Sequence, residues 1–498
     1  MEPSTLQRSR TPTAETPETS ATGARRPLSP LHWTIIGAVA LLGISTALIL
    51  WARTRPGFDP YGWLVWGHQS LTGSLDTNAA PSWKPLPFLF TVPYALVGHY
   101  QVWLWMITSL AVSLSGVVFA GRIAYRLTLL RSGDEVDPRL RWAAWAAALF
   151  AGAALLGVRD YWHYLLSAQS DPMIVALCLA AVDCHLSGRR RWAFALGALA
   201  SLGRPEVWPF LAAYAIWAWL RVPEMRWLIA AGVVVLLALW FGIPALTSRS
   251  PFVAGTNAIG SGRALKHDRV LGTIDRFLDL HETPLELAAL VSLALAALRR
   301  DWRLLVLAAG CVVWVIVEIA FALHGWPGLP RYMFEAAAGM VVIAAVLIGW
   351  LLVAPADLVF PRRLGDPPRL LSPLGLAGVV VALVIVGTLV PAAVERVRGE
   401  HHDLVVQRER TKQINRLAAT VAKLGGAARL RSCGEPLTRL EWQTVVAWTL
   451  RVNVASVGFR YARAIHRGNP IVLFTPRRRG WQVQALHQRL AHCRRLPH

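Results

Sequence analysis

Residues 192–220 read WAFALGALASLGRPEVWPFLAAYAIWAWL and are bounded by Arg189–Arg191 on one side and Arg221 on the other. Two full crossings of a bilayer need about 40 residues, and this run is far shorter. Because Lys and Arg concentrate in cytoplasmic loops, we expect both ends in the cytoplasm and the apex, GRPE, below the outer headgroups. Arg204 and Glu206 at that depth are functional candidates, and an internal ion pair between them is the structural alternative.

Apolar runs of this kind recur along most of the chain. The 498 residues have a mean hydropathy of +0.42, and 55% are hydrophobic while only 16% are charged. This composition excludes an ordinary soluble protein of the same length. We predict an all-α polytopic membrane bundle of about eleven transmembrane helices, several of them shorter than the ~20 residues of a perpendicular span. The predicted spans are 32–52, 101–120, 142–157, 171–187, 192–203, 206–220, 226–245, 283–298, 303–322, 333–353 and 371–392.

The basic residues of the short loops predict the orientation. One alternate set of loops carries sixteen Arg residues, and the opposite set, without the long loop 246–282, carries six Lys or Arg residues. The first set is therefore expected in the cytoplasm, which makes this a multi-pass protein of the cytoplasmic membrane with its N terminus inside. Residues 1–30, rich in Pro, Thr, Ser and Glu, are expected to form a disordered cytoplasmic tail, and residues 31–392 the transmembrane domain. The loops that then open on the external face are 53–100, 158–170, 204–206, 246–282 and 323–332.

Residues 393–498 are predicted to form a small basic α/β domain on the external face. They hold 20 Lys and Arg against 6 Asp and Glu. Helical patterns cover 403–424 and 442–450, and strand-like patterns cover 427–433, 452–459 and 469–476. The positive charge could hold an anionic lipid head or a cell-wall polymer, or it could be a solvated surface. Because many other basic residues lie in short loops between apolar runs, we expect no nucleic-acid partner.

The first external loop contains the segment FDPYGWLVWGHQSLTGSLDTNAAPSWKPLPFLF, residues 58–90. Trp63, Trp66 and Trp83, beside Tyr61, are typical of a segment that lies in the membrane interface. Asp59 heads a helix-like stretch, where a helix N-cap would be its structural role. Lys84 precedes an apolar run, where it could snorkel to the interface or bind a phosphate near the headgroups.

Two further external positions carry charge. Asp171 opens the fourth predicted span in LSAQSDPMIV, where the order Ser-Asp-Pro is also a good helix start. Arg331 and Tyr332 lie in HGWPGLPRYMFE, at the outer mouth of the tenth predicted span. Charged residues from distant segments are thus expected on one face of the membrane.

In this order, the external residues resemble those of the GT-C superfamily of integral-membrane glycosyltransferases, which take a sugar from a polyprenyl phosphate. The nearest pattern is that of the lipid A aminoarabinose transferases and protein O-mannosyltransferases. In that family an acid follows the first span, here Asp59, and a Lys-Pro follows in the same loop, here Lys84–Pro85. An Asp-Pro opens the fourth span, here Asp171–Pro172, and a basic residue lies at the apex of the short hairpin, here Arg204. An Arg-Tyr lies at the mouth of a late span, here Arg331–Tyr332. The resemblance covers residues 32–350. The family often has Asp-Glu or Asp-Asp at the first position, whereas this chain has Asp59–Pro60.

The resemblance implies transfer of a sugar from a polyprenyl-phosphate donor to a cell-envelope acceptor on the external face, by a protein embedded in membrane lipids. Such a transfer needs a base for the acceptor proton and cations for the departing phosphate. Asp59 would be the base, and Asp171 would orient the acceptor or restrain a cation. The predicted substrate-binding residues are Lys84, Arg204, Glu206, Arg331, Tyr332 and Trp63. No Cys/His cluster predicts a metal, although carboxylates on one face could admit a divalent ion.

Two other functions fit parts of the pattern. A secondary transporter would gather its polar residues near the membrane midplane on broken helices, whereas Asp59, Lys84 and Asp171 are expected on one side of the bilayer. A non-catalytic GT-C-like protein of envelope assembly would explain the missing second acid beside Asp59.

Two of the five cysteines, Cys433 and Cys493, lie in the polar C-terminal region, and the other three lie in apolar runs. An external domain meets an oxidising compartment, where a disulfide is favoured over free exposed thiols. We predict a disulfide between Cys433 and Cys493, and the alternative is two thiols too far apart to bridge.

Overall fold

The computed structural model describes residues 29–129, 138–260, 262–353, 373–466, 468–488 and 490–494. By compactness the chain divides into residues 1–40 and residues 41–498. The first unit is described only from residue 29, as the beginning of helix α1 (Pro30–Ala52). The predicted tail, residues 1–30, thus lies almost entirely outside the described residues, and the contacts given below belong to the second unit.

Helices dominate the described residues, and six are long and apolar enough to cross a membrane. They are Leu31–Ala52, Gly98–Leu129, Pro223–Thr247, Trp302–Leu323, Pro330–Leu352 and Gly375–Lys423. A seventh candidate is the pair of α13 (Arg269–Leu278) and α14 (Thr283–Arg299), which bends by 96° at its break. Apolar runs become helices in a bilayer because a helix satisfies its backbone hydrogen bonds internally. The prediction of a mostly helical membrane protein is confirmed.

Each of the eleven predicted runs contains a helix, but several are too short to count as a full span. Helices α7 (Asp171–Leu186), α8 (Arg190–Ser201) and α9 (Trp208–Arg221) have 16, 12 and 14 residues, and α5 (Pro138–Leu156) is a shorter apolar helix. A helix rises about 1.5 Å per residue, so these helices reach only part of the way across a hydrocarbon core of about 30 Å. The count supported by length and composition among the described residues is therefore six or seven.

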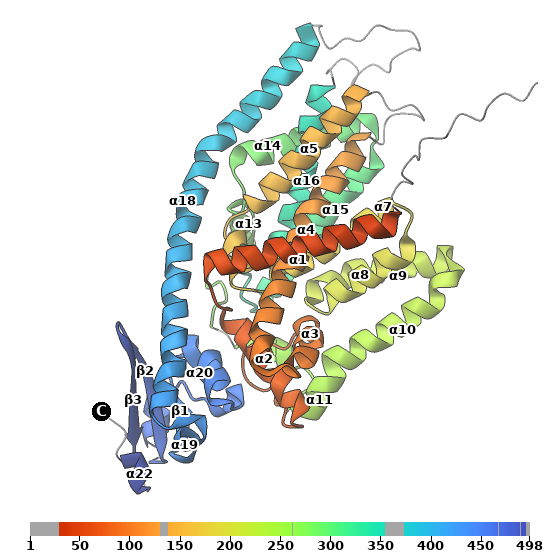
Figure 1. Ribbon diagram of the computed structural model, residues 1–498. Coiled ribbons are helices and arrows are strands. Elements are labelled where there is room, and N and C mark those ends of the chain that lie inside the picture. Colours follow the sequence, from red (N-terminus) through yellow and green to blue (C-terminus); the bar gives the residue numbers. More distant parts are fainter. Residues whose placement is uncertain are drawn as a thin grey trace, which may run out of the picture. The chain divides into compact units, whose positions relative to one another are not determined.

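Helix α16 (Phe334–Leu352) forms the centre of the helical core, and nearly all of its residues are buried. It packs against α4 (Gln101–Leu129), α15 (Trp302–Leu323), α5 and α14 (Figure 1). Small residues permit this close approach, since a Cβ at Gly339 would overlap the sulfur of Cys311. Charged groups at the start of α16 are consequently surrounded by protein.

Helix α2 (Phe58–Leu71) packs against α3 (Pro85–Ala95). A Cβ at Gly62 would overlap Pro81, and a Cβ at Gly67 would overlap the backbone of Thr91, so both glycines are needed for the close packing.

The predicted interfacial position of the first-loop tryptophans is wrong. Trp63, Trp66 and Trp83 are fully buried, because α2 packs inside the protein instead of lying at the lipid surface. The first loop is consequently a rigid part of the core.

Short elements complete the helical part of the chain. They are α6 (Tyr161–Leu166), α10 (Arg226–Leu237), a π-helical turn (Ala238–Gly242), α11 (Ile243–Thr247), α12 (Val253–Ile259), and 3-10 turns at Gly98–Tyr100, Pro205–Val207, Pro223–Met225 and Pro330–Met333. The turn Pro205–Val207 joins α8 to α9 and is the apex of the predicted hairpin.

Helix α18 (Pro373–Lys423) is 51 residues long and passes without a break through the predicted domain boundary at residue 393 (Figure 1). It packs against α14 and α16 near its start, and against α20 (Gln443–Leu450) and the terminal sheet near its end. The last apolar run and the C-terminal region therefore share one continuous helix.

The C-terminal region contains a three-stranded sheet in the order β1 (Glu435–Leu437), β2 (Ile471–Arg477), β3 (Gly480–Leu486). Strand β1 pairs with β2 in parallel, and β2 pairs with β3 antiparallel. Helices α19 (Gly426–Ser432), α20, α21 (Tyr461–His466) and α22 (Ala491–Arg494) accompany the sheet. The prediction of a small α/β region is confirmed, with two of its three strands in other places.

Two strand predictions are wrong. Residues 427–433 form most of helix α19, since their Ala, Leu and Arg residues are good helix formers. Residues 452–459 form a 3-10 turn, Val454–Ser456, and only a single bridge joins Gly458 to the sheet. Period-two alternation over so few residues also fits one turn of helix, so it does not separate the two structures.

Candidate functional site

Six of the predicted site residues, from five separate segments, lie together in one charged cluster. The cluster consists of Asp59, Lys84, Asp171, Arg204, Glu206 and Arg331. These residues lie at the N-terminal ends of α2, α3 and α7 and of the 3-10 turns at residues 205–207 and 330–333. Proline stands in the first turn of each of these elements and favours a helix start there.

Asp171 is the central anion of this charged cluster. Its buried carboxylate pairs with the guanidinium of Arg204, and its oxygens lie 3.8 Å from the Lys84 ammonium and 3.9 Å from the Arg331 guanidinium. The N-cap of α7 is Ser170, and no side-chain capping bond forms there. Helix capping therefore does not account for Asp171, whose contacts are with three cations.

Arg204 is enclosed by the other members, and its side chain is 2% exposed. Besides Asp171, its guanidinium lies 3.3 Å from Glu206 and 3.8 Å from Glu335, and 4.2 Å from the ring centre of Tyr332. The internal Arg204–Glu206 pair, which the sequence left as an alternative, is thus present. Binding of a phosphate by Arg204 stays a prediction.

Arg331 connects the centre of the cluster to Asp59, with 3.4 Å between its Nη2 and Asp59 Oδ2. The rings of Tyr164 and Tyr332 each lie 5.5 Å from its guanidinium carbon. Asp59 does not cap α2, whose N-cap is Gly57 without a side-chain bond. The Asp59 side chain is 22% exposed and that of Arg331 is 12% exposed, so these two groups lie at the accessible side of the cluster.

Lys84 is the third cation, and its side chain is 15% exposed. Its ammonium donates to the hydroxyl of Ser170 over 3.3 Å and lies 5.8 Å from the ring centre of Trp63. Burial lowers the pKa of Lys84 below that of an ordinary lysine, and the nearby Asp171 opposes this effect. Lys84 therefore stands between an apolar wall and an anion.

Sequence analysis missed two acids of this site, Glu318 on α15 and Glu335 on α16. Both are buried. Neither oxygen of Glu335 has a hydrogen-bond partner among the described residues, and neither do Glu318 Oε1 and Glu206 Oε2. The signal that could have found them is a glutamate inside an apolar run, as in VIVEIAF and MFEAAAG, because an acid within a membrane span is rarely without a function.

An apolar cavity of about 580 Å³ adjoins the charged cluster. Most of its lining consists of aliphatic and aromatic residues from α4, α7, α8, α9, α15 and α16. Glu335 and Trp314 belong to its lining and connect it to the cluster. Glu335 lies 3.8 Å from Arg204, and Trp314 donates a hydrogen bond to the backbone carbonyl of Tyr332. The cavity could accommodate part of an apolar chain whose polar end reaches the cations.

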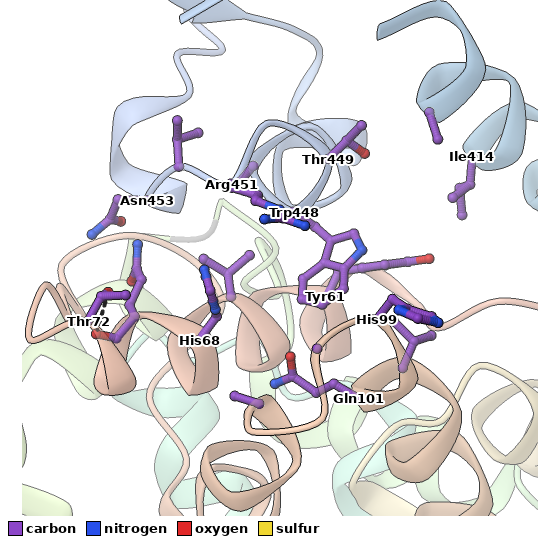
Figure 2. A pocket seen from close by; sticks show the side chains of 18 of the residues that line it. Tyr61, His68, Thr72, His99, Gln101, Ile414, Trp448, Thr449, Arg451 and Asn453 are labelled. Atoms are coloured by element: carbon purple, nitrogen blue, oxygen red, sulfur yellow. Dashed lines mark hydrogen bonds between the residues drawn. The ribbon is translucent and has the colours of Figure 1, made fainter. Parts of the chain in front are cut away.

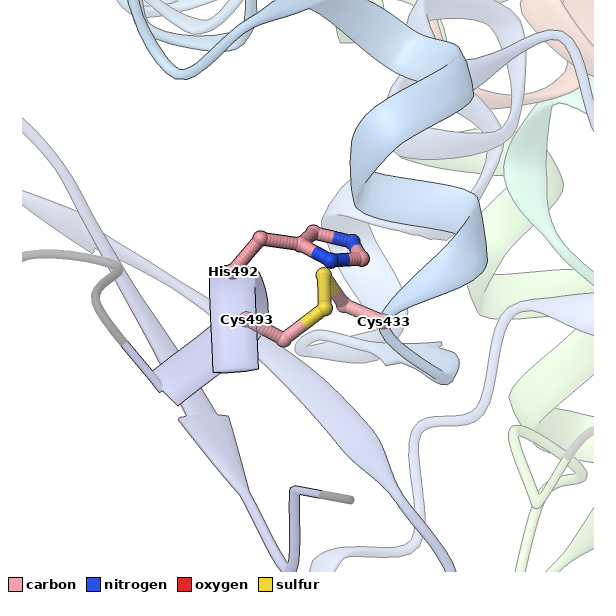
Figure 3. Close-up of side chains that lie close together, drawn as sticks. All are labelled: Cys433, His492 and Cys493. Atoms are coloured by element: carbon pink, nitrogen blue, oxygen red, sulfur yellow. A yellow bond between two sulfur atoms is a disulfide. The ribbon is translucent and has the colours of Figure 1, made fainter. Parts of the chain in front are cut away.

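The Cys433 and Cys493 side chains form a disulfide, with 5.5 Å between their Cα atoms. Together with His492 they are the one set of three possible metal-ligand atoms that lie within 4.8 Å of one another in the described part of the chain (Figure 3). Because metal binding by cysteine needs thiolates, the bonded sulfurs do not provide such a site. The carboxylates of the charged cluster do not meet this distance criterion among the described residues.

Solved structures similar to this chain include two of ArnT and one of AglB. The crystal structures of ArnT from Cupriavidus metallidurans, bound to undecaprenyl phosphate and in the apo state, match with TM-scores of 0.47 and 0.46 at 16% and 15% identity, over 90% of this chain and 93% of ArnT. The archaeal oligosaccharyltransferase AglB from Archaeoglobus fulgidus, in complex with an inhibitory peptide and a dolichol-phosphate, matches with a TM-score of 0.44 at 13% identity, over 86% of this chain and 65% of AglB. No protein-family model matches the sequence, and no curated protein matches it.

Proposed function

We propose that this protein is a membrane glycosyltransferase that moves a sugar from a polyprenyl-phosphate donor to an acceptor on the external face of the cytoplasmic membrane. The observation that carries the proposal is the position of Lys84 and Arg331, two partly exposed cations that share the buried carboxylate of Asp171. Besides Asp171, Arg331 pairs with Asp59, and Lys84 donates to the Ser170 hydroxyl. Both cationic side chains remain partly exposed, so a further anion can reach them. A phosphate fits this role, because its oxygens accept charge-assisted hydrogen bonds from both ammonium and guanidinium groups.

Asp59 is assigned the role of general base. It is the most exposed acid of the cluster, and Arg331 places it beside the position assigned to the phosphate. In the transfer, Asp59 takes the proton of an acceptor hydroxyl, the acceptor oxygen bonds to the anomeric carbon, and the bond from that carbon to the phosphate oxygen breaks. Lys84 and Arg331 then stabilise the charge of the departing lipid phosphate.

The enclosed residues position the others. Arg204 holds Asp171 and Glu206, and its ring contact with Tyr332 fixes the turn that carries Arg331. We assign Arg204 mainly this positioning role, because its side chain has almost no exposed surface.

The apolar cavity beside Glu335 supports a lipid donor. A sugar nucleotide has no apolar chain to occupy a cavity between membrane helices, whereas a polyprenyl chain is apolar along its whole length. The chain already lies in the apolar bilayer, so it enters this cavity without the desolvation cost that a polar sugar nucleotide would meet there.

The proposed topology places the eleven helical runs across or within the membrane, with the N terminus in the cytoplasm and residues 393–498 outside. Asp59 and Lys84 would then face the external side, where the acceptor would be a glycan, lipid or protein of the cell envelope. The excess of arginine in one alternate set of loops supports this orientation.

The test is sugar transfer by the purified full-length protein in nanodiscs, supplied with radiolabelled polyprenyl-phosphate sugars and an envelope extract as acceptor. Asp59→Asn should lower transfer by about 100-fold to 10,000-fold, the usual contribution of a general base. Asp279→Asn removes an exposed acid outside the cluster and serves as the matched control with wild-type activity. An Asp59→Asn variant that transfers at the wild-type rate would exclude the base assignment, and a wild-type protein inactive with every donor would favour a non-catalytic envelope protein.

A further inference from the structure

A second and larger cavity, of about 810 Å³, lies between α2, the start of α4, and the C-terminal helices α18 and α20. Figure 2 shows Trp448 and Arg451, from the end of α20, on one side of this cleft, and Tyr61 and His68 of α2 on the other. We call it the α2–α20 cleft. The donor chemistry proposed above uses none of its lining residues.

Helical spacing separates the α2–α20 cleft from the charged cluster. Asp59 and Trp63 are four residues apart and share one face of α2, the face that contacts Arg331 and Lys84. Tyr61, Val65, His68 and Thr72 follow one another at spacings of four, three and four, and all line the cleft. At about 100° per residue, this second set lies roughly opposite the first. The two sites therefore use opposite faces of one helix.

The lining of the α2–α20 cleft is polar, aromatic and positively charged. Arg55 and Arg451 contribute guanidinium groups, while Tyr61, Trp103 and Trp448 contribute rings. Among the described residues that line the cleft, none is Asp or Glu. Arg55 lies 5.0 Å from the ring centre of Trp103, and the rings of Tyr61 and Trp448 lie 6.2 Å apart. A ligand here would meet apolar ring faces and an excess of positive charge.

One buried oxygen atom at the cleft has no hydrogen-bond partner among the described residues. The Gln69 side chain is 6% exposed, and its carbonyl oxygen accepts no hydrogen bond from the described residues. A buried amide oxygen without a donor costs free energy, and Gln69 belongs to the lining of the cleft. Asn415 and Asn453, also in the lining, add further amide groups.

We propose that the α2–α20 cleft binds an acidic saccharide. Ring faces pack against the C–H faces of sugar rings, amide groups exchange hydrogen bonds with hydroxyls, and arginine pairs with a carboxylate, sulfate or phosphate on the sugar. The site is separate from the transfer chemistry, and binding there does not depend on the proposed glycosyltransferase activity.

Calorimetric titration of the full-length protein in nanodiscs tests this proposal. The probes are tetragalacturonate, a heparin tetrasaccharide and pentamannose phosphate, with maltotetraose as the neutral comparison. We expect at least one acidic probe to bind at least about tenfold more tightly than maltotetraose, and the affinity to fall as salt screens the charges.

Arg451→Gly is the informative variant. Arg451 ends α20 with φ of 53°, a left-handed conformation that glycine adopts without strain, so the variant should fold while losing the guanidinium. Loss of one charged hydrogen bond predicts about a tenfold or larger increase in Kd. Arg479→Gly removes the same charge from the exposed turn between β2 and β3, outside the cleft, and should bind as wild type. Trp448→Phe should retain most of the affinity, and Trp448→Ala should lose it.

Three results would overturn the proposal. These are no binding by any of the three acidic probes, equal binding of maltotetraose, and equal affinity of the Arg451→Gly and Arg479→Gly variants. Asp59→Asn should bind the acidic probe normally, so a failure of the transfer proposal would leave this measurement unchanged.

Discussion

Asp171→Asn should destabilise the protein far more than Asp59→Asn, although the two changes are chemically identical. Asp171 is buried and contacts Lys84, Arg204 and Arg331. Removing one partner of a buried ion pair typically costs about 3–5 kcal/mol. Because Arg204 keeps its two glutamate contacts and Arg331 keeps Asp59, we expect a loss near the lower limit, about 3 kcal/mol.

Asp59→Asn removes one contact of 3.4 Å from a side chain that is 22% exposed. This contact is long for a charge-assisted hydrogen bond, and Arg331 keeps Asp171, so the variant should remain within about 1 kcal/mol of wild type. The pair of variants thus separates a buried acid at the centre of the cluster from an acid at its accessible side.

The assay is equilibrium unfolding in mixed detergent micelles with increasing SDS, followed by near-ultraviolet circular dichroism. Arg204→Met and the double variant Asp171→Asn/Arg204→Met complete a double-mutant cycle. Residues in one ion-pair network show coupling of about 0.5–3 kcal/mol. The double variant should therefore lose less unfolding free energy than the two single variants lose together. If Asp171→Asn is as stable as Asp59→Asn, or if the cycle is additive, the central role given to Asp171 is wrong.

Further measurements test the cation, the disulfide and the topology. Because burial lowers the pKa of Lys84, kcat/KM for the donor should fall as the pH rises through that lowered pKa and the ammonium loses its proton. Lys84→Arg should keep its kcat/KM at alkaline pH because arginine stays charged. A wild-type kcat/KM that is constant up to about pH 10 would contradict this. The Cys433–Cys493 disulfide links residues 60 positions apart, so its reduction should lower the stability of the C-terminal region by roughly 4 kcal/mol. Hydrogen exchange should then become faster in β1–β3 while α16 stays protected. Equal exchange rates in the oxidised and reduced protein would show that the disulfide does not stabilise this region. Cysteines introduced at Asp76 and Gly262 should react with an impermeant maleimide on intact cells, and labelling only after lysis would reverse the proposed orientation.

The helical segments could be read from the sequence because a bilayer leaves few choices. An apolar run with no water to hydrogen-bond its backbone forms a helix, so each of the eleven runs contains one. The C-terminal region follows weaker local preferences, and there the strand prediction at 427–433 failed while β1 and β3 went undetected. Strand pairing in that region depends on partners distant in the chain, such as Glu435 with Ile471.

The residues of the charged cluster were also predictable. Asp59, Lys84, Asp171 and Arg331 are costly groups beside apolar runs, and the alternation of loops across a membrane places such groups on one face before any packing is known. Local sequence therefore predicted which residues share one face of the membrane, before their mutual contacts were known.

Only the tertiary structure decided what each charge does. Arg204 and Arg331 are both arginines at the starts of short helical turns, yet packing encloses one among three carboxylates and leaves the other between Asp59 and Asp171. The same packing brings Glu335 to the cluster and turns the second face of α2 toward α20. The burial of a charge and the choice of its partners depend on how separate segments pack. A displacement of a few ångströms separates a buried structural group from an accessible one, and no local pattern in the sequence encodes it.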